Sequence, residues 1–214
     1  MPGKRAQKDP KTRILDTAEK VFSSRGFDGA SVRTIAAGAG VNLPTVYYYF
    51  GSKQGLMLAV LDRRCGPLRQ EHLDLLARYE KEAGGLPPSV ENVLEAMLLP
   101  PLRLAASKSA THAVVMRLIG RIMAEPDLET QTLLLRGHRE VRTVFEEAFA
   151  RSLPGLPREV LLWRCEFVWG VLGSMLCGSQ RVSNETRGAC DPLDTPVVMA
   201  QMIRFLAEGF RAPA

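Results

Sequence analysis

The stretch SVRTIAAGAGVNLPTVYYYFGSK, residues 31–53, contains two short helical patterns separated by a glycine-containing turn. Ser31 is placed to cap the first helix, which ends in the AGAG segment. Asn42 is placed to cap the second, and Pro44 fits its first turn because the missing N–H has no intrahelical partner there. The second helix runs to Phe50, before a glycine. Two short helices joined in this way are typical of a helix-turn-helix motif.

Helical patterns also flank this stretch on both sides. From Arg13 to Arg25, apolar residues recur on one helical face, at Ile14, Leu15, Ala18, Val21 and Phe22. After residue 51, Ser52 opens a further helix that carries Leu56, Met57, Val60 and Leu61. No strand is needed, so we expect an all-α N-terminal domain over residues 1–64, built on three helices, and a second helical domain over residues 65–214.

Charge is distributed unevenly between these two parts. Residues 1–64 hold eleven Lys and Arg against five Asp and Glu, whereas the rest of the chain holds 17 and 18 of the totals of 28 and 23. A net charge of +6 on the first part indicates a polyanionic partner, with nucleic acid the first candidate and an anionic membrane surface the second. A solvated basic surface explains the same asymmetry without any partner.

The aromatic run Tyr47–Phe50 ends the second short helix. Helical geometry turns Val46 and Phe50 inward and places Tyr49 near the same side, which leaves Tyr47 and Tyr48 outside. Tyrosine rings suit phosphate oxygens and thymine methyl groups. Lys53 lies in the first turn of the next helix, where free N–H groups already favour a phosphate. Aromatic core packing remains the alternative for these tyrosines.

Residues 14–63 resemble the DNA-binding domain of TetR-type transcriptional regulators. The resemblance rests on A-x-x-x-F-x-x-x-G-F ending at Phe27, S-V-R-x-I-A from Ser31, A-G-V at residues 39–41, and Y-Y-F-x-S-K from Tyr48. It implies a recognition helix from about Asn42 to Tyr49, which binds a double-stranded DNA operator. The DNA-binding residues expected from the resemblance and the motif are Arg33, Thr34, Asn42, Leu43, Pro44, Thr45, Tyr47, Tyr48 and Lys53.

The resemblance also implies a role for several of these residues. Thr45 and Tyr47 contact phosphates, and Tyr48 lies at or near base edges. Arg33 reaches into the groove from the preceding helix, and Lys53 holds the DNA backbone. The sequence departs from the family pattern at Leu43 and Pro44, where a lysine and a small residue are common.

The second part of the chain is predicted to be helical throughout. Expected helices span about residues 109–124, 127–151, 158–178 and 196–211, with a polar connection over 179–194. Residues 89–106 have helical content that Pro100 and Pro101 are expected to break. The segments RLIGRIMAEP, from Arg117, and LLWRCEFVWGVLGSM, from Leu161, resemble PsrA-type regulators, which respond to fatty acids or their coenzyme A thioesters.

Apolar side chains in the middle helices are numerous enough to line a pocket for a small hydrophobic effector. Arginines spaced four apart on an apolar helix are suited to hold its carboxylate or phosphate group. The predicted ligand-binding residues are Met116, Arg117, Ile119, Arg121, Met123, His138, Phe145, Trp163 and Phe167. Core packing, and solvent exposure for the arginines, explain the same residues without a ligand.

The last two predicted helices carry the candidate dimer interface. Small residues recur every four positions on the first, and an apolar stripe runs along the second. The predicted interface residues are Gly170, Ser174, Gly178, Val198, Met202 and Phe205. Packing within one chain is the alternative, whereas the family resemblance implies a homodimer, which would read a near-palindromic operator.

Other protein classes are disfavoured by the motifs. The four cysteines form no C-x-x-C pair, and no glycine-rich phosphate loop, H-E-x-x-H or G-x-S-x-G is present, so no cofactor, metal or enzymatic activity is expected. Arg164 and Glu166 interrupt the apolar run 160–178, which favours a buried helix over a membrane span. The basic N-terminus lacks a following apolar segment, so we expect a cytoplasmic protein.

The sequence therefore predicts a homodimeric repressor that a fatty acid or acyl-CoA releases from its operator. Three alternatives remain. One is a regulator of efflux or detoxification genes that responds to a drug-like or aromatic compound. The others are a DNA-binding protein without sequence preference and an enzyme.

Overall fold

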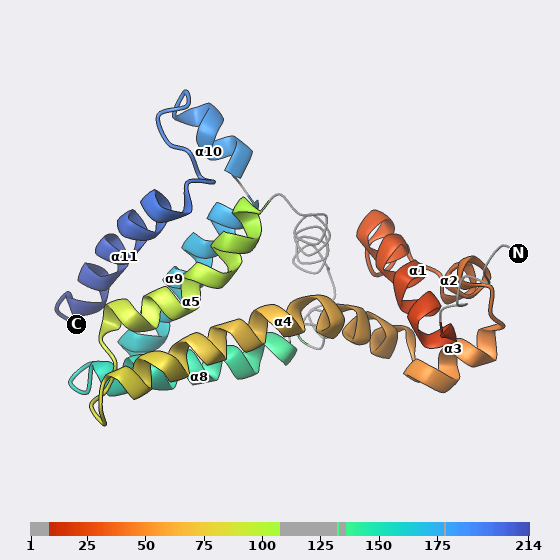
Figure 1. Ribbon diagram of the computed structural model, residues 1–214, viewed down its shortest axis with the longest axis horizontal. Coiled ribbons are helices and arrows are strands. Elements are labelled where there is room, and N and C mark those ends of the chain that lie inside the picture. The colour runs from red at the N-terminus through yellow and green to blue at the C-terminus, as the bar shows by residue number, and fades with distance from the viewer. Residues whose placement is uncertain (1–8, 108–131, 133–135, 178) are drawn as a thin grey trace, which may run out of the picture. The chain divides into compact units, whose positions relative to one another are not determined.

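The computed structural model describes residues 9–107, 132, 136–177 and 179–214, and its regular structure there is helical throughout (Figure 1). The predicted all-α class is therefore confirmed. The chain divides into two compact units. Among the described residues, the N-terminal unit contains 9–66, 132 and 136, and the C-terminal unit contains 67–107, 137–177 and 179–214.

The N-terminal unit consists of α1 (Pro10–Arg25), α2 (Val32–Ala39), α3 (Leu43–Phe50) and the first part of α4 (Lys53–Glu82). The apolar periodicity of the sequence forms its core, because α1 packs against α2, and α3 packs against both. The buried residues of this core are Ile14, Ala18, Phe22, Phe27, Ala30, Val32, Ile35, Ala36, Ala39, Val46, Leu56, Met57, Val60 and Leu61.

The turn between α2 and α3 depends on two glycines. Gly40 has a φ of 63°, in the left-handed region, and its N–H closes α2 by donating to Ala36 and Ala37. A Cβ at Gly38 would lie 2.9 Å from Cγ2 of Thr17, so α1 can approach α2 closely only without a side chain there. These two positions fix the angle at which α3 leaves the turn.

Helix boundaries in this unit differ slightly from those predicted. Helix α1 begins at Pro10 rather than Arg13, because proline is favoured in a first turn. Ser31 stands at the N-cap of α2 but its side chain makes no capping hydrogen bond, whereas Asn42 caps α3 as predicted.

An ionic network joins α1 to α4 within the N-terminal unit. The Arg64 guanidinium donates to Glu19 through Nε at 2.5 Å and Nη2 at 2.6 Å. Arg63 donates to Glu19 at 2.7 Å and to Asp16 at 2.8 Å. Burial of Glu19 opposes its ionisation, but the hydrogen bonds from Arg64 and Arg63 outweigh burial and lower its pKa. The network therefore holds the beginning of α4 against α1 through a charged, nearly buried carboxylate.

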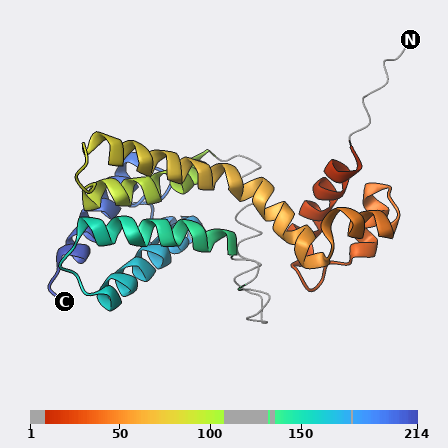
Figure 2. The same cartoon turned by 90° about the horizontal axis from the view of Figure 1, so that it is seen from below.

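The C-terminal unit contains the rest of α4, with α5 (Val90–Ala106), α8 (Arg136–Ser152), α9 (Arg158–Cys177), α10 (Ser179–Glu185) and α11 (Thr195–Arg211). The later part of α4 lies beside α5 and α8, joined to them by the pairs Glu71–Arg103 and Glu80–Arg151 (Figures 1 and 2). Helix α11 packs chiefly on α5.

The core of this unit is larger and contains stacked aromatic rings. Phe149 and Phe210 are fully buried, with ring centroids 4.2 Å apart. Arg164, which interrupts the apolar run, binds the end of α11 by donating to the carbonyls of Phe210, at 2.8 Å, and Ala212, at 2.9 Å. Arg164 therefore satisfies orphan carbonyl groups at a helix end, which explains a cation within an otherwise apolar helix.

Two predictions for this unit were wrong. Pro100 and Pro101 lie inside α5 and do not break it, because both rings are buried in the core, where their packing offsets lost backbone hydrogen bonds. The polar connection predicted over residues 179–194 contains the short helix α10.

Candidate functional site

Helix α3 presents an aromatic face that nothing in the described part of the chain covers. Val46 is buried at 1% exposure, while Tyr47 is 46% and Tyr48 84% exposed. Helical geometry explains the division, since Val46 and Phe50 lie four residues apart on the side that packs on α1 and α2. Tyr49, which helical geometry places near the side of Val46, is 37% exposed, and its ring packs edge-on against Tyr48 at 5.3 Å.

The N-terminal end of α3 is held by a capping hydrogen bond. Asn42 Oδ1 accepts the Thr45 backbone N–H at 2.9 Å and also the Thr45 hydroxyl. Leu43 is half-buried against the core, and Pro44 is exposed. Two predicted DNA-binding side chains, Asn42 and Thr45, are thus engaged with each other.

Lys53 is oriented by the connection between α1 and α2. Its Nζ donates to the Asp28 carbonyl at 3.2 Å and lies 4.5 Å from the centre of the Phe27 ring. An ammonium group has three donors, so two remain for an anion. The sequence showed the lysine at the start of α4, but Asp28 lies 25 residues before it and Phe27 one residue further, and no pattern linked them to Lys53.

Arg33 and Thr34 are exposed on α2. Helix α2 belongs to the same small unit as the α3 residues. Helix α3 itself carries no charged residue. Positive charge for an anionic partner therefore comes from neighbouring helices, while α3 supplies hydroxyl and apolar groups.

The predicted effector-binding residues are divided between three environments. Phe145 is buried in the C-terminal core, with the His72 ring edge-on at 5.8 Å. Trp163 and Phe167 are each 60% exposed and stack on one another at 6.0 Å, so they line the surface of α9 rather than an interior cavity. The remaining residues, Met116, Arg117, Ile119, Arg121, Met123 and the His138 side chain, lie outside the described residues.

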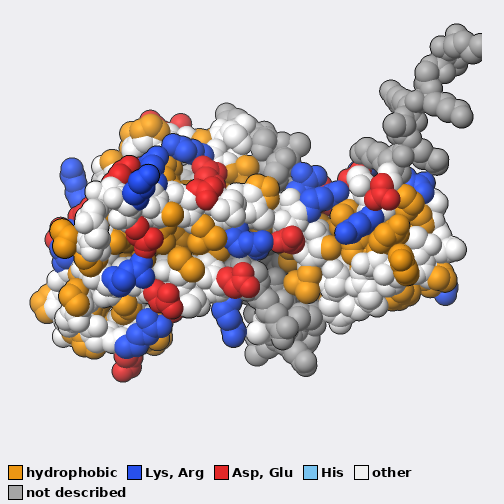
Figure 3. Space-filling view, turned by 60° about the horizontal axis from the view of Figure 1, so that its bottom comes forward, with side chains coloured by type: hydrophobic (Ala, Val, Ile, Leu, Met, Phe, Trp, Pro, Cys, Tyr) orange, Lys and Arg blue, Asp and Glu red, His pale blue; other side chains and the backbone are white. Residues whose placement is uncertain are grey.

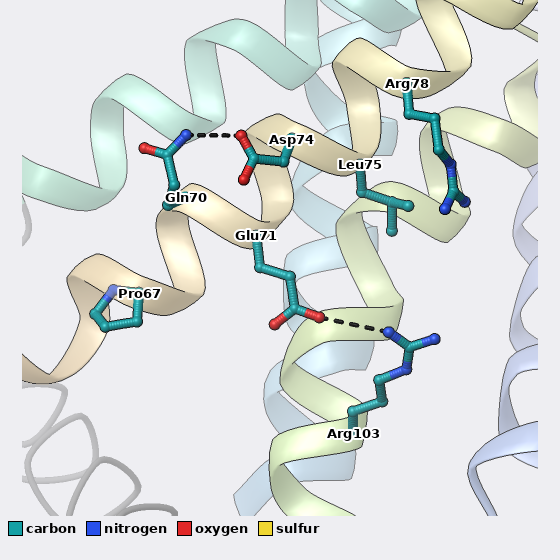
Figure 4. Close-up of a pocket in the computed structure, with 7 residues that line it drawn as sticks. All are labelled: Pro67, Gln70, Glu71, Asp74, Leu75, Arg78 and Arg103. Atoms are coloured by element: carbon teal, nitrogen blue, oxygen red, sulfur yellow. Dashed lines mark hydrogen bonds and ion pairs between the residues drawn. The ribbon is translucent and has the colours of Figure 1, made fainter.

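A cleft of about 550 Å³ opens between α4 and α5 in the C-terminal unit (Figure 4). Its polar groups are largely paired with one another, since Arg103 lies 3.5 Å from Glu71, and Gln70 donates to Asp74 at 2.8 Å. Figure 3 likewise shows basic, acidic and apolar side chains interspersed on one face of the molecule. None of the residues that line this cleft was predicted from the sequence to bind the effector.

Helices α9 and α11 expose a set of apolar side chains in the C-terminal unit, which we call the α9/α11 surface. It comprises Leu162, Trp163, Phe167, Val197 and Phe205, with Phe205 74% exposed. Gly170 and Ser174 are also exposed on α9, and Ser174 accepts a hydrogen bond from Arg181 of α10 at 3.2 Å.

The other predicted interface residues have different positions. Met202 is 7% exposed and belongs to the core, and Val198 packs against that core, because this side of α11 faces the other helices of its own chain. Gly178 lies outside the described residues. The exposure of Val197 and Leu162 was not predicted from the sequence, because hydropathy alone does not distinguish these two residues from their buried neighbours.

The described residues contain neither a membrane-spanning helix nor a metal-binding cluster. None of their helices is long and apolar enough to cross a membrane. Within the same residues, no group of three or more His, Cys, Asp and Glu side chains is arranged to hold a metal ion.

Two curated relatives match this chain over short stretches. The HTH-type transcriptional repressor NicS of Pseudomonas putida is 47% identical over 62 residues, 28% of this chain and 29% of that protein. The HTH-type transcriptional regulator EthR of Mycobacterium tuberculosis is 44% identical over 55 residues, 26% of each chain. The chain thus aligns with little more than a quarter of these relatives' length.

Solved structures share the fold of almost the whole chain. The regulator FadR from Bacillus subtilis, in complex with stearoyl-CoA, aligns with a TM-score of 0.60 and 15% identity over 92% of this chain and 98% of that one. NalD, the secondary repressor of the MexAB-OprM multidrug efflux pump in Pseudomonas aeruginosa, aligns with a TM-score of 0.63 and 19% identity over 94% and 96%.

Family models match both units of the chain. Residues 14–60 match the bacterial regulatory proteins of the tetR family, and residues 95–209, more than half of the chain, match the tetracyclin repressor-like C-terminal domain. The N-terminal match includes the turn glycines, the cap of α3 and its exposed tyrosines. The chain therefore belongs to the tetR family of bacterial transcriptional regulators.

Proposed function

We propose that this chain is a ligand-responsive transcriptional repressor that binds a near-palindromic operator as a homodimer and is released by a small hydrophobic effector. Residues 1–64 form the DNA-binding domain, and residues 65–214 bind the ligand and dimerise. The observation that carries the proposal is the exposed face of α3, where Tyr47 and Tyr48 stand outside a unit whose core is otherwise closed.

Positive charge beside that face supports DNA as the partner. Lys53 and Arg33 flank α3 from α4 and α2, and a net charge of +6 in residues 1–64 favours the phosphate backbone over neutral partners. Tyr47 is assigned to phosphates and Tyr48 to base edges, while the Thr45 hydroxyl, whose proton Asn42 accepts, can only accept a further hydrogen bond. Phosphate contacts make the affinity fall steeply with salt.

The α9/α11 surface supports self-association. Trp163, Phe167 and Phe205 expose apolar area that a monomer leaves in water, and a second copy of the same surface would bury it symmetrically. Gly170 and Ser174 would let the two backbones approach closely. A twofold dimer reads two half-sites about 34 Å apart, which is why the operator is expected to be a near-palindrome.

The effector is proposed to be a fatty acid or an acyl-CoA. The resemblance of this chain to PsrA-type regulators, and the fold that it shares with FadR bound to stearoyl-CoA, support this class. A drug-like or aromatic compound is the second candidate, because NalD, a repressor of a multidrug efflux pump, has the same fold. In either case the ligand releases DNA only by binding the released conformation more tightly than the DNA-bound one.

The first test is recovery of bound DNA from a fragmented bacterial genome that encodes the chain, followed by sequencing. We expect a few enriched near-palindromes with the wild-type protein and none with the variant carrying Tyr47→Ala and Lys53→Ala. The double variant should keep its helical content. Equal enrichment by both proteins would exclude the α3 face as the DNA-binding site.

A second test addresses the effector. Thermal shift measurements with saturated fatty acids, acyl-CoAs and a panel of drug-like aromatic compounds should show stabilisation by one class, since a ligand that binds only the folded state raises its stability. The same compounds should lower the amount of DNA bound. Stabilisation by aromatic compounds alone would replace the fatty-acid proposal with the second candidate.

A further inference from the structure

We propose that the base-reading end of α3 selects thymines through their methyl groups and not through side-chain hydrogen bonds. Leu43 and Pro44 are assigned this role. The inference rests on the proposed function, since it specifies which feature of the operator α3 recognises.

Asn42 cannot form its usual pair with adenine while it caps α3. That pair requires the amide oxygen to accept from the adenine N6 group while the amide nitrogen donates to N7. In this chain Oδ1 already accepts the Thr45 N–H, at 2.9 Å, and the Thr45 hydroxyl. Recognition of adenine would therefore break the cap, which is worth about 1 kcal/mol of stability.

Thr45 is limited by the same contact. Its hydroxyl proton points to Asn42, so the oxygen can accept a hydrogen bond but has no proton left to donate to a phosphate or a base. The methyl group of its side chain is unaffected. Thr45 therefore contributes an acceptor and an apolar group to the exposed end of α3.

Leu43 and Pro44 have no hydrogen-bonding group in their side chains, and Pro44 also lacks a backbone N–H. Pro44 is exposed and Leu43 is half-buried, so both offer apolar surface at the first turn of the helix. In helix-turn-helix proteins the N-terminal residues of the recognition helix contact the base edges. The position that would read bases in this chain is therefore apolar.

Thymine is the one base that presents a methyl group in the major groove, so an apolar reading surface favours it. Tyr47 and Tyr48 extend that surface with two exposed rings. Of the two basic residues predicted to bind DNA, Lys53 is assigned to the DNA backbone, which leaves Arg33, on α2, to pair with guanine. We therefore expect half-sites in which thymines opposite the start of α3 carry most of the specificity.

The test uses two duplex libraries with a random central segment of about 30 base pairs, long enough for two half-sites one turn apart. One library is amplified with thymidine and the other with deoxyuridine, which differs by the C5 methyl group alone. Wild-type protein should enrich a palindrome from the thymidine library and fail to enrich it from the deoxyuridine library. Equal enrichment of the same palindrome from both would overturn the inference while leaving the proposed function intact.

Single substitutions then assign the methyl contacts to residues. Replacing one contacted thymine by deoxyuridine should weaken wild-type binding about fourfold, the factor that corresponds to burying one methyl group. The same replacement should have no effect on binding by Pro44→Ala or Leu43→Ala at the thymine that each contacts. An unchanged loss in both variants would show that other residues read the methyl groups, and the inference would fail.

A control variant outside the N-terminal unit separates the possible causes of failure. Leu86→Ala, at a residue 74% exposed in the C-terminal unit, should bind both DNAs as the wild type does. If folded wild-type protein enriches no sequence from the thymidine library, the proposed function fails and this inference fails with it.

Discussion

The two units both expose large aromatic side chains, but of different kinds. Helix α3 of the N-terminal unit exposes Tyr47 and Tyr48, whose hydroxyl groups need polar partners. The α9/α11 surface of the C-terminal unit exposes Phe167 and Phe205, which have no polar atom, beside Trp163. Tyrosines suit a wet, charged surface such as DNA, and phenylalanines suit a dry interface. The type of exposed aromatic residue therefore indicates the partner more clearly than the exposed area does.

The units also differ in how they are held together. The N-terminal unit has a small core, to which the network of Glu19, Arg63 and Arg64 adds charged contacts. The C-terminal unit relies on a larger core and on the stack of Phe149 and Phe210. Substitutions should accordingly affect the two units through different interactions.

The largest effect is expected for Phe149→Ala, compared with Phe205→Ala. Phe149 is fully buried, so its removal should lower the free energy of unfolding of the C-terminal unit by about 3–5 kcal/mol. Phe205→Ala should leave the stability of the monomer almost unchanged and reduce self-association. Denaturant unfolding and sedimentation velocity would measure the two effects. A large loss of monomer stability in Phe205→Ala would contradict its assignment to an interface.

An intermediate effect is expected for Arg64→Ala, compared with Arg78→Ala. Removing Arg64 leaves the nearly buried Glu19 carboxylate without two hydrogen bonds, which should cost the N-terminal unit about 1–3 kcal/mol. Arg78 pairs with Glu82 four residues away on an exposed helix surface, where such pairs contribute roughly 0.3–0.5 kcal/mol. Its guanidinium also lies 4.9 Å from the centre of the Tyr79 ring, a contact that contributes about 0.5–1 kcal/mol at exposed sites. Thermal unfolding of both variants would test the difference, and equal losses would show that the network contributes no more than a surface pair.

A smaller effect is expected for the cap of α3. Asn42→Ala should destabilise the N-terminal unit by about 1 kcal/mol, whereas Asn42→Ser should be nearly neutral because serine also caps helices. Circular dichroism during chemical unfolding would measure both variants. An equal loss in the two variants would indicate that the Asn42 amide acts through contacts other than the cap.

The smallest effect is expected for the pH dependence of stability that arises from Glu19. Because the folded-state pKa of Glu19 lies below its ordinary value of 4.5, its contribution to stability is present above that pH and is lost as the pH falls through the lowered pKa. The stability difference between wild type and Glu19→Gln should be constant near neutral pH and shrink in acid below 4.5. A difference that grew in acid would reverse the sign of the inferred shift.

The sequence predicted the N-terminal unit better than the C-terminal one, for a physical reason. In the N-terminal unit the fold follows from local signals, including the Asn42 cap, the turn glycines and the period of the apolar residues. The contacts of Lys53 with Phe27 and Asp28 were not predicted, because they join residues far apart in the sequence.

In the C-terminal unit the same apolar residue types occur both in the core and on the exposed surface. Hydropathy does not distinguish Met202, which is buried in the core, from Phe205, three residues later and 74% exposed. Trp163 and Phe167 were assigned to a pocket for this reason, and their exposed position on α9 now supports a role in the interface. Pro100 and Pro101 led to the wrong prediction of a helix break, because only tertiary packing allows two prolines inside α5.

The most direct test of the account is a titration of one labelled palindrome, taken from the bound genomic fragments, with three proteins. We expect two wild-type protomers to bind cooperatively. The variant with Tyr47→Ala and Lys53→Ala should not bind, and the variant with Trp163→Ala and Phe205→Ala should bind each half-site weakly and independently. If the first variant bound as the wild type does, or the second kept full cooperativity, the roles assigned here to α3 and to the α9/α11 surface would be contradicted.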